Sequence, residues 1–524
     1  MSDAAGPGSA HRATVAVIGG GIAGLAAAWE LSGGAAGPGP GTPAVVVLEA
    51  GDRLGGKLRS ESFEGRRLDS GPDGFLGRRP EAVALCREIG LDESLRPIGA
   101  SGAAVWARGR RRPLPDGLAL GITTKFWPLV RSGILGFGGN VRVLLDVIAP
   151  RPDSRGPLGD RAIGPLVARK LGRRVVDTMV DPMIGGIHAG SVADISAAAV
   201  FPVLLAASKQ GSFMRSLRRA MAAPPPVATA PPEDPDESAG PAEPEPDTAA
   251  TEPAPAFYAV EGGFATLVEQ LEKVLGDRDV ELRCSSAVQV LQRAGHGPRR
   301  WELSLEEGSL EADGIVLAVP PQPAAELLDD HDEEAAGLLR SIDQASVVLV
   351  TFAFDADAVP EDLFGTGLLV PPGSKRPPAD DGDTEFLITA CTLLSAKWPH
   401  LALPGESLVR ASAGRMGDER IAELDDMALQ ARMVEELGLL LGIEAEPRAV
   451  RVTRWPGAFP QYRVNHLLRV AGIEAGVRRL PAMTIAGSAY RGVGIPACIG
   501  SGREAARELL GVLAPDGGEA GSGR

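Results

Sequence analysis

The sequence has few of the residue groups that would indicate a metal centre, a disulfide framework or a membrane span. Its four cysteines, Cys86, Cys284, Cys391 and Cys498, are widely spaced, with no C-x-x-C pair and no histidine cluster beside them. Neither a zinc site nor a set of disulfide bonds is therefore expected. No stretch reaches the roughly 18 uninterrupted apolar residues of a membrane-spanning helix, and the N-terminus lacks the basic start and apolar run of an export signal. We expect a cytoplasmic protein without a bound metal ion.

Positive charge is also scarce. The 524 residues carry a formal net charge of −15, but residues 220–256 hold eight acidic side chains and no lysine or arginine. The rest of the chain is only mildly acidic, which gives no general attraction to nucleic acid and predicts no nucleic-acid partner. Because the same segment contains 11 of the 44 prolines, it cannot bury enough apolar surface to offset the entropy of ordering it. We predict a disordered linker at 224–256 and a disordered tail at 516–524.

The feature around which the chain is organised is a glycine-rich turn near its N-terminus. A β-branched run at 14–18 leads into Gly19-Gly20-Gly21-Ile22-Ala23-Gly24 and then into an Ala-rich helical stretch that ends at Leu31. In a G-x-G-x-x-G turn of this kind, the first glycine makes the turn, the second admits a pyrophosphate to the helix N-terminus, and the third lets helix pack on strand. The spacing alone is weak, because an ordinary glycine-rich turn would produce it too.

The required context follows downstream. A second apolar run at 44–48 predicts a buried strand, and it ends on Glu49, where a carboxylate can accept hydrogen bonds from a ribose. Gly24 and Glu49 are 25 residues apart, more than the usual ~20. The Gly/Pro/Ala-rich loop at 33–43 absorbs the excess, so a β-α-β unit is predicted.

Two further glycine-rich turns lie beside this unit or at the far end of the chain. Residues 50–59 contain a Gly55-Gly56 pair with the cations Arg53 and Arg59, and this order after Glu49 resembles the FAD-binding signature of the flavoprotein group of amine oxidases, phytoene desaturases and protoporphyrinogen oxidases. Near the C-terminus, a strand at 484–486, a turn at 487–494 and a helix offer a second helix dipole to the cofactor. We predict bound FAD, with these contacting residues: Gly19, Gly21, Ile22, Ala23, Gly24, Glu49, Ala50, Arg53, Gly55, Gly56, Lys57, Leu58, Gly71, Pro72, Asp73, Gly74, Gly487, Val493, Gly494 and Ile495.

The remaining segments predict an α/β protein with three parts. The FAD-binding part is Rossmann-like and discontinuous, at 11–97, 257–329 and 451–515, and its later strands are read from apolar runs near 280–282, 287–291, 301–305 and 314–319. A mixed-sheet substrate domain is predicted at 98–117 and 330–450. Apolar residues at three- and four-residue spacing in 126–148 and 166–179 predict a helical insertion at 118–223. Its apolar stretch at 122–130 fits helical core, a substrate channel or contact with a membrane surface.

Three other segments narrow the resemblance. They are residues 181–190 (DPMIGGIHAG) with Ile195-Ser196, residues 260–267 (VEGGFATL), and residues 454–462 (RWPGAFPQY) with His466. Together they resemble the protoporphyrinogen and coproporphyrinogen oxidases over nearly the whole chain, and amine oxidases and desaturases do not share this set. Soluble Gram-positive members of the family act on coproporphyrinogen III, and the Ala-, Gly-, Arg- and Pro-rich composition is typical of a high-GC bacterium.

The resemblance implies six-electron oxidation of coproporphyrinogen III to coproporphyrin III in haem biosynthesis. The macrocycle would lie over the flavin and lose electrons in three two-electron steps, each returned through FAD to oxygen as hydrogen peroxide. No dedicated acid–base residue is needed, and His188 and His466 are predicted to be structural. Relatives place a cation in the loop after 68–77 against a substrate propionate, so Arg78 and Arg79 are candidate substrate-binding residues. A transient contact with the next enzyme of the pathway and a peripheral membrane contact are further expectations.

Three alternatives stay open. Protoporphyrinogen IX is the second candidate substrate on the same scaffold. Amine oxidation needs an aromatic cage near the flavin, and a chain with three tyrosines builds one poorly. The third alternative is a chaperone-like module that shares the fold without retaining flavin, and the intact C-terminal glycine-rich segment argues against it.

Overall fold

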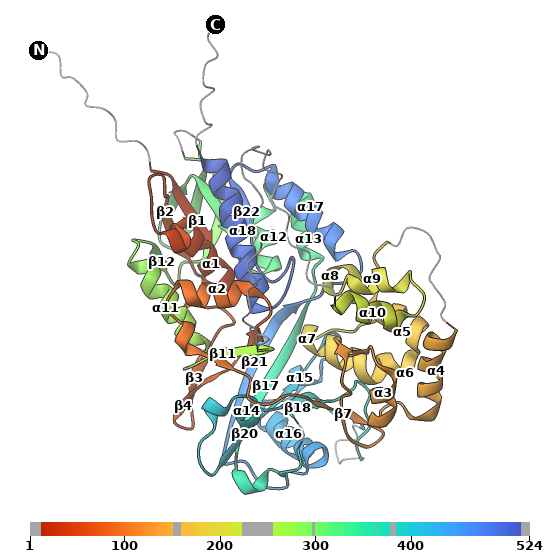
Figure 1. Cartoon of the computed structure of the whole chain (residues 1–524). Coiled ribbons are helices and arrows are strands. Elements are labelled where there is room, and N and C mark those ends of the chain that lie inside the picture. The colour runs from red at the N-terminus through yellow and green to blue at the C-terminus, as the bar shows by residue number, and fades with distance from the viewer. Residues whose placement is uncertain are drawn as a thin grey trace, which may run out of the picture.

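The computed structural model describes residues 12–149, 159–222, 255–295, 299–363, 365–377 and 384–514. The predicted linker, apart from residues 255 and 256, and the predicted tail lie outside these residues. The described elements form three regions in Figure 1: a parallel sheet with helices on both faces, a helical region, and a seven-stranded sheet.

The parallel sheet confirms the predicted β-α-β unit. Its strands, in the spatial order β12-β2-β1-β16-β22, are all parallel. Their bounds are β1 (Thr14–Ile18), β2 (Ala44–Leu48), β12 (Glu281–Arg283), β16 (Gly314–Leu317) and β22 (Met483–Ile485). Alternate residues of β1 enter different cores: Val15 and Val17 contact one, Ala16 and Ile18 the other. A strand that is buried on both faces needs the continuous apolar run from which it was predicted.

Helices cover both faces of this sheet (Figure 1). One face holds α1 (Ile22–Leu31), α2 (Pro80–Glu88), α11 (Phe264–Gly276) and α18 (Ile495–Leu513), and the other holds α12 (Pro321–Leu328), α13 (Glu333–Arg340) and α17 (His466–Arg478). Short connecting pieces complete the region: η1 (Gly34–Ala36), β3 (Ser60–Phe63), β4 (Arg66–Asp69), β5 (Phe75–Leu76), η2 (Asp92–Ser94), β6 (Leu95–Pro97) and β11 (Phe257–Val260).

One expectation about this sheet is wrong. Strands β13 (Val288–Arg293) and β14 (Trp301–Leu305) do not join it; with β15 (Ser309–Ala312) they form a separate antiparallel sheet, and only β12 and β16 from that stretch belong to the parallel one. Only Leu291 of β13 is buried, whereas Val290 and the residues beside this pair are exposed. This pattern is typical of a strand that has one face in solvent rather than of a strand covered on both faces.

The seven-stranded sheet has the order β21-β17-β20-β19-β18-β7-β8. Its strands are β7 (Ala104–Ala107), β8 (Arg110–Pro113), β17 (Gln344–Asp355), β18 (Gly367–Leu369), β19 (Ile388–Leu393), β20 (Glu406–Ala413) and β21 (Ala449–Pro460). Helix α16 (Asp426–Leu441) packs on one face, and η4 (Ala356–Ala358), α14 (Leu394–Lys397), η5 (Pro399–Leu401) and α15 (Arg420–Glu423) lie between strands. Strand β21 begins at Ala449 and continues through the Pro456-Gly457 pair to Pro460, so the domain boundary predicted at 450 falls inside this strand.

The described residues 118–149 and 159–222 form the helical region. Its elements are the hairpin β9 (Leu118–Ala119) and β10 (Ile122–Thr123), then α3 (Phe126–Ser132), α4 (Gly136–Ile148), α5 (Ile163–Leu171), α6 (Arg173–Val175), the π-helix η3 (Val176–Gly185), α7 (Gly186–His188), α8 (Ala197–Val200), α9 (Val203–Ser208) and α10 (Phe213–Ala222). The helix predicted over 126–148 is two helices, because Gly133 adopts a left-handed φ of 66° and ends α3.

Helix α4 buries its carboxylate and exposes several of its apolar residues. The Asp146 side chain is buried and accepts hydrogen bonds from the backbone N–H groups of Phe213 and Met214 and from the Ser212 hydroxyl. The opposite face carries Phe137, which is 87 % exposed, with exposed Val141, Leu145 and Ile148 at helical spacing. Within the described residues, no helix combines the length and the apolar character that crossing a bilayer requires.

Candidate active site

A cavity of about 900 Å³ lies between the parallel sheet and the seven-stranded sheet. Sixteen of the twenty residues predicted to contact FAD line it: Gly19, Gly21, Ile22, Ala23, Glu49, Ala50, Gly55, Gly56, Lys57, Leu58, Gly71, Pro72, Asp73, Gly487, Val493 and Ile495. The fold therefore brings three distant stretches of the chain to one cavity. The other four are Gly24, Arg53, Gly74 and Gly494.

Each of these four residues lies next to residues that line the cavity. A Cβ on Gly24 would lie 1.9 Å from the Gly19 carbonyl oxygen, so this glycine is needed where α1 packs on β1. Arg53 donates hydrogen bonds to backbone carbonyls of its own turn, including that of Gly56 at 2.6 Å. Gly74 lies against the Trp398 ring, and Gly494 is the N-cap of α18.

Two helix N-termini meet at the cavity. Gly21 caps α1 and Gly494 caps α18, and neither has a side chain that could occupy the first free N–H groups of its helix. A Cβ built on Gly21 meets no atom within 4 Å, so open space lies above the α1 N-terminus. Both ends offer backbone donors and a positive dipole to an anionic group.

The charged side chains at this end complete the arrangement. Glu49 accepts hydrogen bonds from the N–H groups of Gly20 at 2.7 Å and Gly51 at 2.8 Å, which fixes its carboxylate at the end of β2. Lys57 donates to the Ala458 carbonyl at 2.6 Å, and partial desolvation there lowers its pKa. A carboxylate for a ribose and a cation beside two helix N-termini fit a dinucleotide such as FAD.

The other end of the cavity lies against the seven-stranded sheet, and sequence reasoning did not identify its lining. The cavity-facing side chains include Val347 and Leu349 of β17, Ser412 of β20, and Trp455 and Phe459 of β21. Thr389, Thr392 and Gln344 add polar groups. This end therefore combines apolar walls with several polar groups, as is usual in sites for small organic ligands.

Buried charges lie where the two ends meet. Arg410 of β20 lines the cavity, and its sequence signal was the single basic residue of that strand. Asp73 pairs with Lys397 at 3.0 Å; although burial opposes this, Lys397, Arg410 and the hydrogen bonds lower the pKa of Asp73 to about 2. Burial raises the pKa of Asp69 to about 6.

The hydrogen bonds of Asp69 also explain why the 260–267 segment has a glycine pair, Gly262-Gly263. Its carboxylate accepts hydrogen bonds from the Phe264 N–H at 2.8 Å and from the Ser60 hydroxyl, and thus holds the start of α11. Gly263 has a φ of 79°, and a Cβ there would lie 2.4 Å from the Ser60 oxygen. This segment is therefore a structural support for the cavity wall.

Arg78 and Arg79 are exposed and do not line the cavity. Arg79 forms an ion pair with Glu81 at 2.5 Å. Its charge nevertheless lowers the pKa of the Cys498 thiol, against the larger effect of burial, which raises that pKa to about 11. Cys498 is a lining residue, so this loop lies near the cavity, and the substrate-binding role of the two arginines stays a prediction.

The histidines of the 181–190 and 454–466 segments belong to a buried aromatic cluster. The Tyr462 ring stacks on His466 with centroids 3.9 Å apart, and His188 lies 5.9 Å from Tyr462. His466 hydrogen-bonds the Tyr490 carbonyl, and Tyr462 donates to the Ser488 carbonyl. Burial lowers the pKa of both histidines to about 4, so both are neutral at pH 7. Neither lines the cavity, consistent with the structural role predicted for them.

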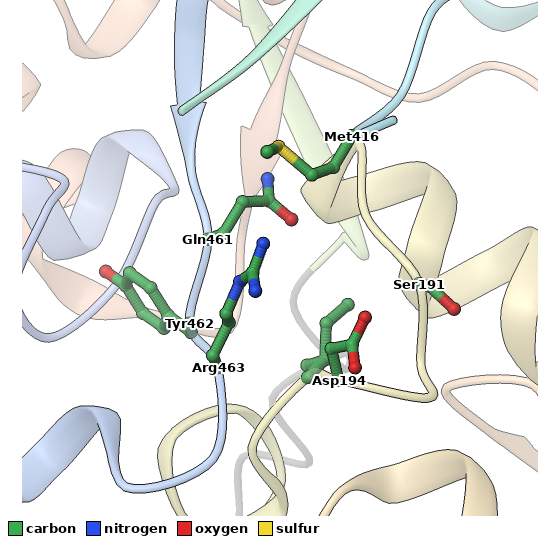
Figure 2. A pocket seen from close by; sticks show the side chains of 7 residues that line it. Ser191, Asp194, Met416, Gln461, Tyr462 and Arg463 are labelled. Carbon is green, nitrogen blue, oxygen red and sulfur yellow. The ribbon is translucent and has the colours of Figure 1, made fainter. Parts of the chain in front are cut away.

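A second, much smaller cavity of about 30 Å³ adjoins this cluster. Figure 2 shows its lining, with Gln461, Tyr462 and Arg463 on one segment and Met416, Ser191 and Asp194 on others. Gln461 donates to the His188 carbonyl at 2.9 Å. Such a space holds one or two water molecules at most, so it is no substrate site.

Comparisons with known proteins agree with this geometry. The family model described as flavin containing amine oxidoreductase matches residues 22–510. The coproporphyrinogen III oxidase of Bacillus subtilis is 30% identical over 95% of this chain and 98% of its own length, and that of Propionibacterium freudenreichii is 32% identical over 97% and 93%. The protoporphyrinogen oxidase of Bos taurus is 29% identical over 95% and 98%.

A solved structure gives the same result at the level of the fold. The crystal structure of an Exiguobacterium protein, provisionally named a protoporphyrinogen oxidase, matches with a TM-score of 0.78 and 27% identity over 96% of this chain and 99% of that one. The chain therefore belongs to the flavin-containing amine oxidoreductase family and, within it, to the protoporphyrinogen and coproporphyrinogen oxidases, as a flavin-dependent oxidoreductase.

Proposed function

We propose that this chain binds FAD and oxidises coproporphyrinogen III to coproporphyrin III in haem biosynthesis. The observation that carries the proposal is the single cavity that runs from the α1 N-terminus to the seven-stranded sheet. Its relatives named coproporphyrinogen III oxidase support the choice of substrate. When bound, FAD supplies the two-electron acceptor that a porphyrinogen needs.

The side chains of this protein would bind and orient the reactants. The N-termini of α1 and α18, Glu49 and Lys57 would hold the dinucleotide, and the apolar wall of β17 and β21 would cover the macrocycle. Each porphyrinogen loses six electrons and six protons, so three oxygen molecules become three molecules of hydrogen peroxide. The protein contributes position and exclusion of water rather than a dedicated acid or base.

Protoporphyrinogen IX is the second candidate substrate, since the bovine relative carries that name. It has two propionates where coproporphyrinogen III has four, so the two differ mainly in charge. Amine oxidation is less well supported, because the aromatic residues among the described lining are Trp455 and Phe459 alone, with no tyrosine.

The substrate is tested by supplying each porphyrinogen separately to the flavin-loaded enzyme in air. We expect kcat/KM to be about tenfold or more higher with coproporphyrinogen III, with three peroxide molecules formed per porphyrin; a tenfold ratio corresponds to about 1.4 kcal/mol in the transition state. Porphyrin fluorescence and a peroxide assay measure both. A higher kcat/KM with protoporphyrinogen IX would reverse the assignment, and no turnover of either would refute the proposal.

We also propose that the exposed face of α3 and α4 contacts an anionic membrane surface. This apolar face is defined by Trp127, Phe137, Val141, Leu145 and Ile148, all exposed. Residues 104–149 contain seven arginines and lysines but only two aspartates, one of which is the buried Asp146. A second copy of this chain would bring the same positive charge against it, whereas anionic lipid complements both the charge and the apolar side chains.

We expect the protein to co-sediment with phosphatidylglycerol vesicles and not with phosphatidylcholine vesicles. Phe137→Ser should lower the bound fraction about tenfold, since burying a Phe side chain is worth about 1.5–3 kcal/mol. Leu468→Ser is the matched control, because Leu468 is 71 % exposed on α17, outside this face. Equal binding by Phe137→Ser and wild type, or self-association that Phe137→Ser abolishes, would contradict the proposal.

The expected cytoplasmic location and the contact with a following haem-pathway enzyme stay predictions.

A further inference from the structure

Arg410 is a buried cation in the interior of the seven-stranded sheet. It lies in β20 between β17 and β19, where Thr351 and Thr392 are its cross-strand partners, and it is 5% exposed. Burial lowers its pKa, opposed by the charges of Asp73 and Asp69. Burying a guanidinium costs free energy unless its N–H groups donate hydrogen bonds to acceptors. The acceptors that Arg410 contacts therefore indicate which part of the protein it holds in place.

Those bonds leave the sheet. Arg410 donates to the Gly71 carbonyl at 3.2 Å and to the Asp69 carbonyl, both in the segment that carries the cavity wall Gly71-Pro72-Asp73. Its Nε donates to the Thr351 hydroxyl at 3.2 Å, which orients the guanidinium within the sheet. One side chain therefore joins the cofactor end of the cavity to the sheet end.

The same wall has a second anchor from the sheet side. Asp73 accepts hydrogen bonds from Lys397 and from the Trp398 indole at 3.1 Å. On its other side, a Cβ at Gly71 would lie 2.3 Å from the Lys57 carbonyl oxygen, so the wall has no room to shift toward that turn. The wall is therefore fixed from both sides, and Arg410 is its attachment to β20.

We propose that Arg410 is a positioning residue that sets the distance between the flavin and the substrate. Ser412 is two residues along β20, lines the same cavity and lies on the same face of the strand. A change in how Arg410 holds Gly71 therefore changes the position of the flavin wall relative to the sheet that would carry the substrate. The claim that Arg410 positions the flavin depends only on the cofactor site. The claim that it positions the flavin relative to the substrate rests on the proposed function.

Arg410→Gln tests the inference, with Arg451→Gln as the matched control. Arg451 also joins the sheet to the cofactor part, through Glu61 at 3.0 Å and the Ser62 carbonyl, but it does not line the cavity. We expect Arg410→Gln to weaken FAD binding by about 10- to 100-fold, because two charge-assisted hydrogen bonds to the wall are lost, and to alter the visible circular dichroism of the bound flavin. Arg451→Gln should change neither.

Turnover of porphyrinogen tests whether Arg410 also affects the position of the substrate. In flavin-saturated Arg410→Gln, kcat should fall more than KM rises, and Arg410→Lys, which keeps the cation but loses the paired geometry, should restore part of both kcat and the dichroism. Wild-type FAD affinity and dichroism in Arg410→Gln, or an equal change in Arg451→Gln, would overturn the inference. If Arg410→Gln does not fold, the FAD affinity and the flavin dichroism of Arg410→Lys test the inference instead. Values between those of wild type and of a protein without flavin would support it, and wild-type values would overturn it. Wild-type enzyme without porphyrinogen turnover would refute the proposed function while leaving those flavin measurements valid.

Discussion

Gly21→Val should abolish stable flavin binding without destabilising the apoprotein. Gly21 is the N-cap of α1, with a φ of −69° that any residue adopts, and a Cβ there meets no atom within 4 Å. The added side chain would therefore project into the cavity, where it would fill the space through which a pyrophosphate approaches the helix N-terminus. We expect the dissociation constant of FAD to rise at least 100-fold, or about 2.7 kcal/mol.

The measurement is a titration of apoprotein with FAD, followed by flavin fluorescence, together with the denaturation midpoint of each apoprotein. Gly24→Ala is the contrasting variant, because its Cβ would lie 1.9 Å from the Gly19 carbonyl oxygen. That substitution should lower the stability of the apoprotein as well as its affinity for FAD. A Gly21→Val protein that is purified with a full complement of flavin would show that the cofactor does not use this turn.

Acidification from pH 7 to pH 5 should lower the free energy of unfolding by about 2 to 3 kcal/mol. Burial lowers the pKa of His188 and His466 from 6.5 to about 4, so the unfolded chain takes up protons in this range while the folded chain does not. Each histidine then contributes a loss of about 2 kcal/mol. Asp69 acts in the opposite direction: its folded pKa is raised to about 6, so its protonation returns about 1 kcal/mol.

Chemical denaturation of the apoprotein at pH 7 and pH 5 measures this difference without interference from flavin release. His466→Gln should remove about half of the histidine contribution, because a Gln amide can still donate to the Tyr490 carbonyl that His466 Nε2 contacts. A wild-type protein equally stable at both pH values would mean that these imidazoles are not held neutral.

The nucleotide end of the site was predictable because each of its parts is local in sequence. A turn such as Gly19–Gly24 and a strand end such as Glu49 carry their geometry within a few residues. Once the strands at 14–18 and 44–48 pair in parallel, the predicted residues meet without further information.

The sheet end was not predictable for the opposite reason. The bonds of Arg410 reach residues more than 300 positions away in the sequence, and a single arginine within a strand does not reveal its partner. The same limit explains why β13 and β14 were placed in the wrong sheet, since periodicity predicts a strand but not its neighbour. Gly133 could have predicted the helix break, but apolar spacing continues across it.

The order of strands in the parallel sheet has a consequence for synthesis of the protein. β1 is the first described strand and β22 is one of the last elements, yet both pair with β16. The turn after β22 lines the same cavity as the end of β1, and α18 follows that turn. A ribosome therefore releases nearly the whole chain before the second helix N-terminus can close the cofactor site. Since a ligand stabilises only the form that binds it, a flavin that needs both helix N-termini stabilises the folded protein only after translation. Nascent chains must protect the apolar edge of β16 without help from the cofactor.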